Sequence, residues 1–302
     1  MPPRRTNISA MQNRLLILVC FVAQLGCERS GTRNTEPSDG PVAGSGSLKS
    51  IAVAGNVHML MGKGGNIGLS VGTDGALIVD DQFANAANDI RAAIKALTRD
   101  KLAFVLNTHH HGDHTGGNAA FGANATIIAH QNARVHLIDN KMSSPGLPVI
   151  TFDDRMSVHF NGEEIRLVHF ANGHTDGDVV VFFTKSNVVH TGDHFFNGRF
   201  PFVDIKGGGN AVQLAKNVEA LIEQLPAGVK IIPGHGELAT IEDIRRFHSM
   251  LVDTINTVRQ YKTAGLSIED AKKRGVSAKW DSWGKAYVNV ETWIEIIYTS
   301  LD

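Results

Sequence analysis

Apolar residues recur along this chain at two alternating spacings, about every second residue in some stretches and every third or fourth residue in others. The shorter spacing is typical of β-strands, and the longer spacing is typical of amphipathic helices. Glycines between the first short apolar stretches indicate hairpin turns. The pattern therefore predicts mixed α and β structure, with a meander of strands first and strands alternating with helices later.

The same pattern gives approximate bounds for each element. Strands are predicted at Ile51–Ala54, Val57–Met61, Ile67–Val71, Ala76–Val79, Leu102–Leu106, Thr126–Ala129, Glu164–Phe170, Val179–Phe183 and Val188–His190. Helices are predicted at Ala84–Leu97, Ala211–Gln224, Ile241–Lys262, Ile268–Arg274 and Val290–Leu301. This order of elements predicts an α/β fold in which two β-sheets lie between layers of helices.

The composition fits an ordinary folded protein. Of the 302 residues, 42% are hydrophobic and 20% are charged, which excludes a collagen, a coiled coil and a wholly disordered chain. The formal net charge of -1 provides no basic excess, so we do not expect nucleic acid as a partner. The 14 histidines are the unusual feature of the composition and direct attention to metal chemistry.

The first 27 residues resemble a signal peptide. They hold Arg4, Arg5 and Arg14 but no carboxylate, and the apolar run 15–23 follows directly. This run has the length of a signal-peptide core and is shorter than the roughly 20 residues that span a membrane. We therefore expect export to the periplasm or the cell envelope, with a cytosolic N-terminal tail as the alternative.

Both cysteines lie in this predicted leader. Cys27 follows Gly26 in a segment that resembles a bacterial lipoprotein cleavage site, although Gln24 departs from that pattern. Plain secretion and membrane attachment through a lipidated Cys27 are therefore both open. Once the leader is removed, Cys20 is lost, so neither a disulfide nor a thiolate metal site is expected in the folded part.

A flexible linker is predicted at residues 28–47, because this segment is rich in Ser, Gly and Pro and almost free of large apolar side chains. The folded part then begins near Leu48 and is expected to form one domain, residues 48–302. No second linker interrupts it.

The densest cluster of potential metal ligands follows the predicted strand Leu102–Leu106. In an extended segment, His109 and His111 point to the same side and can bind one ion. Asp113 and His114 come after Gly112, where the backbone can turn, so that they can reach a second ion. The segment therefore predicts a metal site built from nitrogen and oxygen ligands.

Three later segments have a common form, in which an apolar strand ends in a glycine-rich turn that carries a potential ligand. These ligands are His174, Asp193 and His235. Each turn alone is a weak signal. Together with the first cluster they give seven candidates without cysteine, which is enough for two ions that share one carboxylate.

The ordered set of His109, His111, Asp113 and His114 followed by His174, Asp193 and His235 resembles the metallo-β-lactamase superfamily, which includes zinc β-lactamases and glyoxalase II. The resemblance covers essentially residues 48–302. It implies an αββα sandwich with two zinc ions at the edge of the sheets. His109, His111 and His174 would bind one ion, Asp113, His114 and His235 the other, and Asp193 would bridge both.

The implied activity is that of a binuclear zinc hydrolase. Two such ions provide a hydroxide at neutral pH and polarise the attacked carbonyl, and Asp113 would orient the hydroxide. The expected substrate is a small molecule with an ester, lactone, thioester or β-lactam-type amide bond. From the residue types alone, iron and manganese remain open. The alternatives are a mononuclear iron oxidoreductase similar to persulfide dioxygenases, and a metal binder without catalysis.

Two segments are candidates for substrate contacts. The turn 59–65 contributes Met61 and Lys63, and the segment after Asp193 contributes Phe196 and Arg199. Zinc β-lactamases with a mobile flap have Cys at the position of Asp193 and Lys at that of Phe196, so at most weak β-lactamase activity is expected. No protein partner can be inferred, and the glutathione-binding region of glyoxalase II is not recognisable.

Four further residues beside the cluster are assigned supporting roles. Asp178 and Thr191 are expected to hold the outer nitrogens of ligand histidines through hydrogen bonds. His110 and His194 are expected to point away from the ions, toward the surface or toward residues behind the ligands.

Overall fold

The computed structural model describes residues 48–302. The predicted signal peptide 1–27, with Cys27, and the predicted linker 28–47 lie outside the described residues. Within the described part, no helix has both the length and the apolar character that a membrane span requires.

The fold is built from two mixed β-sheets. A seven-stranded sheet has the order β1 (Lys49–Ala54), β2 (Val57–Met61), β3 (Ile67–Gly72), β4 (Gly75–Val79), β5 (Leu102–Leu106), β6 (Thr126–His130), β7 (Ile150–Phe152). A five-stranded sheet has the order β12 (Lys230–Ile232), β11 (Val188–His190), β10 (Val179–Phe183), β9 (Glu163–His169), β8 (Arg155–Phe160). Strands β4 to β7 are parallel to one another, as are β11 and β12, and the remaining pairs are antiparallel.

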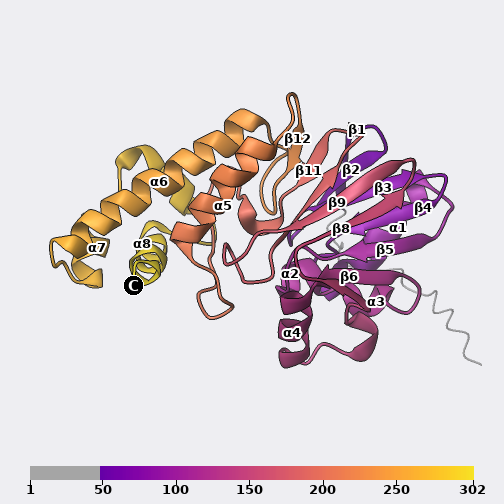
Figure 1. Ribbon diagram of the computed structural model, residues 1–302, viewed down its shortest axis with the longest axis horizontal. Helices are drawn as coiled ribbons and strands as arrows, with labels where there is room; N and C mark the ends of the chain where they lie inside the picture. The colour runs from indigo at the N-terminus through magenta and orange to yellow at the C-terminus, as the bar shows by residue number, and fades with distance from the viewer. Residues whose placement is uncertain (1–47) are drawn as a thin grey trace, which may run out of the picture. The chain divides into compact units, whose positions relative to one another are not determined.

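Helices cover the outer faces of both sheets (Figure 1). The α-helices are α1 (Ala87–Leu97), α2 (Gly112–Thr115), α3 (Asn118–Phe121), α4 (Gln131–Asp139), α5 (Ala211–Gln224), α6 (Ile241–Thr263), α7 (Ile268–Arg274) and α8 (Val290–Ser300). Short 3-10 helices are η1 (Ala84–Ala86), η2 (Ser144–Gly146), η3 (Gly192–His194) and η4 (Ala278–Lys285).

Period-two alternation along the strands explains the layers. In β4, Leu77 and Val79 face the core between the two sheets, whereas Ala76 and Ile78 face α1. In β10, alternate residues likewise face the core between the sheets or the layer of α5, α6 and α8. Because both faces of these strands are buried, their sequences are almost continuously apolar. The predicted αββα sandwich is confirmed.

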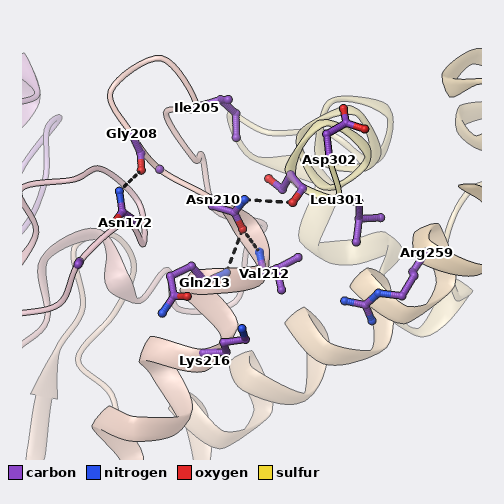
Figure 2. A pocket seen from close by; sticks show the side chains of 13 residues that line it. Asn172, Ile205, Gly208, Asn210, Val212, Gln213, Lys216, Arg259, Leu301 and Asp302 are labelled. Atoms are coloured by element: carbon purple, nitrogen blue, oxygen red, sulfur yellow. Dashed lines mark hydrogen bonds between the residues drawn. The ribbon is translucent and has the colours of Figure 1, made fainter.

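Asn210 fixes the start of α5 and joins it to the C-terminal helix (Figure 2). Its side-chain Oδ1 accepts hydrogen bonds from the backbone N–H groups of Val212 and Gln213, at 2.9 and 3.0 Å, which satisfies two donors that a helix leaves unpaired at its N-terminus. Its Nδ2 donates to the carbonyl oxygen of Ser300 in α8. One side chain thus holds two helices of the outer layer together.

The structure differs from the predicted elements in several places. The predicted helix Ala84–Leu97 begins as the 3-10 helix η1 and becomes α-helical only at Ala87. Helix α4 and strands β7 and β8 were not predicted. Strand β8 has apolar residues at alternate positions, but polar residues separate them and it lies at the edge of its sheet, so it lacks the continuous apolar run of the central strands.

Asn161 connects the two sheets at one end of the sandwich. It lies in the β8–β9 turn with a positive φ of 53° and is 6% exposed. Its Nδ2 donates to Ser70 Oγ and to the Gly75 carbonyl oxygen, and its Oδ1 accepts the backbone N–H of Asp74. A residue of the second sheet thus satisfies polar groups of the β3–β4 hairpin in the first.

We expect Asn161→Ala to destabilise the protein by about 2–3 kcal/mol, because three side-chain hydrogen bonds are lost and buried partners remain unsatisfied. Thermal or urea unfolding measures this loss. Asn187→Ala is the matched control, since Asn187 has a φ of 54° but only one listed-range side-chain bond, to Ala227, at the surface. Equal losses in the two variants would show that backbone strain, and not the bonds between sheets, accounts for the effect.

Candidate active site

The candidate ligands come together because several strands end at one edge of the sandwich. Strands β4 and β5 are parallel neighbours, as are β11 and β12, so the segments that follow each pair emerge at the same end. The loop after β5 carries the first cluster of histidines and continues into α2. The segments after β11 and β12 bring Asp193 and His235, and the turn between β9 and β10 brings His174.

One group of ligand atoms consists of His109, His111 and His174. His111 Nδ1 lies 3.2 Å from His109 Nε2 and 2.9 Å from His174 Nε2. His109 and His174 are buried, and His111 is partly exposed. The three nitrogens converge closely enough to bind a single ion.

A second group consists of Asp113, His114 and His235. His235 Nε2 lies 3.3 Å from Asp113 Oδ2 and 3.4 Å from His114 Nε2, and the latter lies 3.6 Å from Asp113 Oδ2. This arrangement also suits one ion.

Asp193 lies between the two groups. Its Oδ2 is 3.4 Å from His174 Nε2 and 3.5 Å from His235 Nε2, and its Oδ1 is 3.2 Å from His114 Nε2. The carboxylate is 5% exposed, and among the described residues Oδ1 has no partner in hydrogen-bonding geometry. A Cβ at Gly234 would lie 2.0 Å from Oδ1, so only glycine leaves space for this carboxylate.

The outer nitrogens of four histidines are held by hydrogen bonds. His174 Nδ1 donates to the Phe202 carbonyl oxygen at 2.7 Å, and His111 Nε2 donates to Asp204 Oδ2 at 3.0 Å. His114 Nδ1 donates to Asp80 Oδ2, also at 2.7 Å. Each ring therefore carries its proton on the outer nitrogen and directs the lone pair of the other nitrogen into the site.

His109 is oriented through an intermediate hydroxyl group. Thr108 Oγ1 donates its proton to Asp80 Oδ2 at 2.7 Å, so it accepts the proton of His109 Nδ1 at 3.0 Å. The backbone N–H of Thr108 also donates to Asp80, at 2.8 Å. The buried Asp80 therefore positions two ligand histidines, one directly and one through Thr108. The sequence analysis did not identify Asp80 or Asp204.

The predicted roles of Asp178 and Thr191 are wrong. Asp178 accepts the backbone N–H groups of His174 and Thr175, and so shapes the turn without contacting a ligand imidazole. The Thr191 hydroxyl donates to backbone carbonyl oxygens of Gly192 and Ile232. Both side chains act on the backbone because each lies in a tight turn, where the nearest unpaired groups are main-chain atoms.

Strong electrostatic coupling accompanies this packing. Burial disfavours the charged form of Asp193, but His114, His235 and His174 outweigh burial and hold the pKa of its carboxyl well below the usual value. Burial also opposes the charged form of His235, yet Asp193 and Asp113 raise its pKa to about 9. Burial lowers the pKa of His174 to about 4. The site thus favours an anionic Asp193 surrounded by positive charge.

These features fit a metal ion. Several histidine lone pairs face one another at about 3 Å, and a buried carboxylate oxygen points among them. Lone pairs at this distance repel each other unless a proton or a cation lies between them. Imidazole and carboxylate are ligands that suit zinc and also iron or manganese.

A cavity of about 580 Å³ opens over the candidate ligands and exposes His111, Asp113, Asp193 and His235 in its lining. Three of the four predicted substrate contacts, Lys63, Phe196 and Arg199, line it. The ring of Phe196 stacks on that of His235, with centroids 5.2 Å apart.

Met61, in contrast, does not line this cavity, and its predicted role is corrected. Alternation along β2 places Met61 on the same face as Val57 and Met59, where it packs against the core between the sheets.

The remaining histidines near the site are buried and not at the surface. His110 is 5% exposed and stacks on His136 with ring centroids 4.2 Å apart. His194 is fully buried next to Asn217. Neither belongs to the two ligand groups around Asp193, which agrees with their predicted exclusion. His110 does lie close to His111 and Asp204, on the outer side of the ligand ring.

A second hollow, of about 920 Å³, lies beside α5 and α8 (Figure 2). Lys216, Arg259 and Asp302 border it, but none of the seven candidate ligands does. The cluster of potential ligands is therefore confined, within residues 48–302, to the edge of the sandwich and its cavity.

The sequence profile of the metallo-beta-lactamase superfamily matches residues 61–235. This range covers more than half of the chain and includes all seven candidate ligands. The chain belongs to the metallo-beta-lactamase superfamily.

Relatives with assigned names are hydroxyacylglutathione hydrolases. The chain is 33% identical to that of Methylococcus capsulatus over 148 residues, which are 45% of this chain and 48% of the relative. It is 26% identical to that of Gloeobacter violaceus over 224 residues, 68% of this chain and 84% of the relative. The match to the Methylococcus protein thus spans about half of that relative's length.

Solved structures show the same fold. A metallo-beta-lactamase from Pontibacter korlensis superposes with a TM-score of 0.62 at 16% identity, covering 68% of this chain and all of the other. A double mutant of a sec-alkyl sulfatase gives a TM-score of 0.67 at 15% identity, covering 84% of this chain and 50% of the other. At such low identity these similarities establish the fold alone.

Proposed function

We propose that this protein is a binuclear zinc hydrolase. The observation that carries the proposal is the convergence of seven imidazole and carboxylate side chains into two groups that share Asp193. His109, His111 and His174 would hold one ion, and Asp113, His114 and His235 the other. Asp193 would contact both ions because its two oxygens reach nitrogens of both groups.

The reaction would be hydrolysis of an acyl derivative, in which the bond between the carbonyl carbon and its leaving group breaks. Two bound zinc ions would lower the pKa of water and polarise the carbonyl. Asp113 lines the cavity with a partly exposed carboxylate, which is suited to orient the attacking water and to pass its proton to the leaving group. The described cavity lining contains no Ser, Thr or Cys, which favours direct attack by water.

Among acyl derivatives, we propose a thioester first and an ester, lactone or β-lactam-type amide next. The names of the relatives support this order, because a hydroxyacylglutathione is a thioester. Phe196 follows Asp193 by three residues and fills the wall beside His235 with an apolar ring. That wall offers no cation for a β-lactam carboxylate at this position, which supports weak β-lactamase activity at most.

We expect the purified protein to bind about two zinc ions per chain and to lose hydrolysis when they are chelated, because both ligand groups offer three or more donors. Elemental analysis and thioester turnover before and after treatment with a chelator, followed by addition of zinc, measure this. One bound iron per chain together with oxygen consumption would instead support a mononuclear oxidoreductase. Two bound zinc ions without turnover of any acyl substrate would support a metal binder.

We also propose that the hydrolase domain, residues 48–302, is exported and joined by residues 28–47 to the cell envelope. The support is the basic and apolar leader that ends at Cys27. We expect cell fractionation to find the protein outside the cytoplasm, and Cys27→Ser to release it from membranes if this residue is lipidated. Full-length chain with an intact leader in the cytosol would contradict the proposal.

A further inference from the structure

Aromatic side chains from three distant segments surround the mouth of the cavity. Phe83 comes from the turn after β4, Phe202 from the segment after η3, and Tyr287 from the segment between η4 and α8. The rings of Phe202 and Tyr287 meet edge to face, with centroids 6.1 Å apart. Phe83 is 42% exposed and Tyr287 is 90% exposed, so large apolar surfaces are left open at the entrance.

The exposure of Tyr287 does not result from a loosely packed segment. Its neighbours Trp283 and Val288 are buried at 3% and 2% exposure and belong to the core beneath α6 and α8. These two anchors hold the backbone in place while the phenol ring projects beside the cavity.

Phe83 is likewise held outward by its neighbour. Gln82 has a positive φ of 56°, a conformation that is unfavourable for a residue with a side chain, and its amide donates to the Gly65 carbonyl oxygen at 2.8 Å. The buried Gln82 thereby fixes the turn, and the next residue presents its ring at the cavity. Backbone strain next to a site is typical of positions maintained for binding.

The same cavity contains cationic side chains without an acidic partner. Arg199 is partly buried and Lys63 is exposed, and neither forms a hydrogen bond or an ion pair within the described residues. A guanidinium can form two parallel hydrogen bonds with one carboxylate. A partly buried arginine that lines a cavity without a partner is therefore suited to bind an anionic group of a ligand.

We propose that the preferred substrate carries both an aryl group and a carboxylate, one on each side of the bond that is cleaved. The aryl group lies against Phe83 and Tyr287, the carboxylate pairs with Arg199, and the carbonyl lies over Asp113 and Asp193. This inference rests on the proposed hydrolase function and names the substrate class of that site. The cavity volume of about 580 Å³ is within the range of pockets that enclose a ligand of this size.

A set of four thioesters tests the proposal on the purified, zinc-loaded full chain. Phenylacetyl or acetyl groups are joined through sulfur to mercaptoacetate or to its uncharged amide, and hydrolysis gives the free acid and a thiol that a thiol reagent detects. We expect phenylacetyl mercaptoacetate to have the highest kcat/KM, at least about tenfold above the compounds that lack the aryl group or the charge.

Substitutions then assign each preference to a residue. Arg199→Met is expected to lower kcat/KM about 10–100-fold for the two carboxylates and to leave the two amides unchanged, as expected for loss of a charged hydrogen bond. Tyr287→Ala is expected to lower it about 3–10-fold for the two phenylacetyl compounds only. Arg259→Met, at the exposed groove of Figure 2, is the matched control and should change none of the four.

Binding of an uncleavable analogue separates this inference from the proposed function. In phenethyl-thioacetate, a methylene replaces the carbonyl, and calorimetry on the wild type and the two variants measures its affinity without turnover. Weaker binding to both variants, with no thioester hydrolysed, would retain the substrate class and overturn the hydrolase function. Hydrolysis of all four thioesters at equal rates, or equal losses for all four in each variant, would overturn the inference and leave the hydrolase function intact.

Discussion

Asp193→Ala is expected to lower kcat/KM by at least about two orders of magnitude and to reduce the bound zinc below two ions per chain. Asp193 is the side chain whose oxygens lie next to nitrogens of both ligand groups, so its loss removes a ligand from each group at once. Steady-state kinetics together with elemental analysis measures both effects. Asp154→Ala, at an exposed aspartate paired with Arg155, is the control and should leave both quantities unchanged.

Asp193→Cys tests the same residue more finely. A thiolate binds mainly one zinc and places its charge on a single ion, so we expect slower thioester hydrolysis while any weak β-lactam turnover is retained. If Asp193→Ala instead kept nearly full activity and two bound zinc ions, Asp193 would not connect the two groups and the proposed ligand set would be incorrect.

Asp80→Asn is expected to weaken zinc binding by about 10–100-fold and to destabilise the fold by about 3–5 kcal/mol. The Asp80 carboxylate accepts hydrogen bonds from His114 Nδ1, from the Thr108 backbone and from the Thr108 hydroxyl, and is fully buried. An amide has one accepting oxygen and one donating nitrogen, so at least one of these donors would face another donor. Zinc titration and thermal unfolding measure the two losses.

The neighbouring Asp81 provides a matched control. Burial, followed by the charge of Asp80, raises the pKa of its carboxyl well above the usual value, so the side chain is expected to be protonated. Its Oδ1 accepts the Gly117 backbone N–H, which an amide oxygen can also do. We therefore expect Asp81→Asn to be tolerated, and equal damage from both substitutions would contradict the role assigned to Asp80.

Local sequence was sufficient for the central strands and for the ligand cluster. In β4 and β10 every side chain is buried, so continuous apolar residues defined both strands. His109, His111, Asp113 and His114 lie within six residues of one another, and their spacing after β5 already implied convergence. His174, Asp193 and His235 follow the ends of apolar strands, and this repeated position made them recognisable.

Less regular elements were missed because their sequences carry weaker patterns. Strand β7 has three residues, too few for a period to appear. Helix α4 buries only Ala133 and Leu137, so its apolar side is narrow. The short 3-10 turn before α1 has no side-chain cap that would mark where the α-helix begins.

The sequence by itself determined the layered fold, the superfamily and the seven candidate ligands, since periodicity and short motifs are properties of neighbouring residues. Only the tertiary structure identified the groups that orient those ligands: Asp80 is 34 residues from His114, and Asp204 is 93 residues from His111. It also decided that Phe83 and Tyr287 border one cavity while Met61 faces the core. These relations arise when distant strand ends meet at one edge of the sandwich, and no local pattern records which distant segments will meet there.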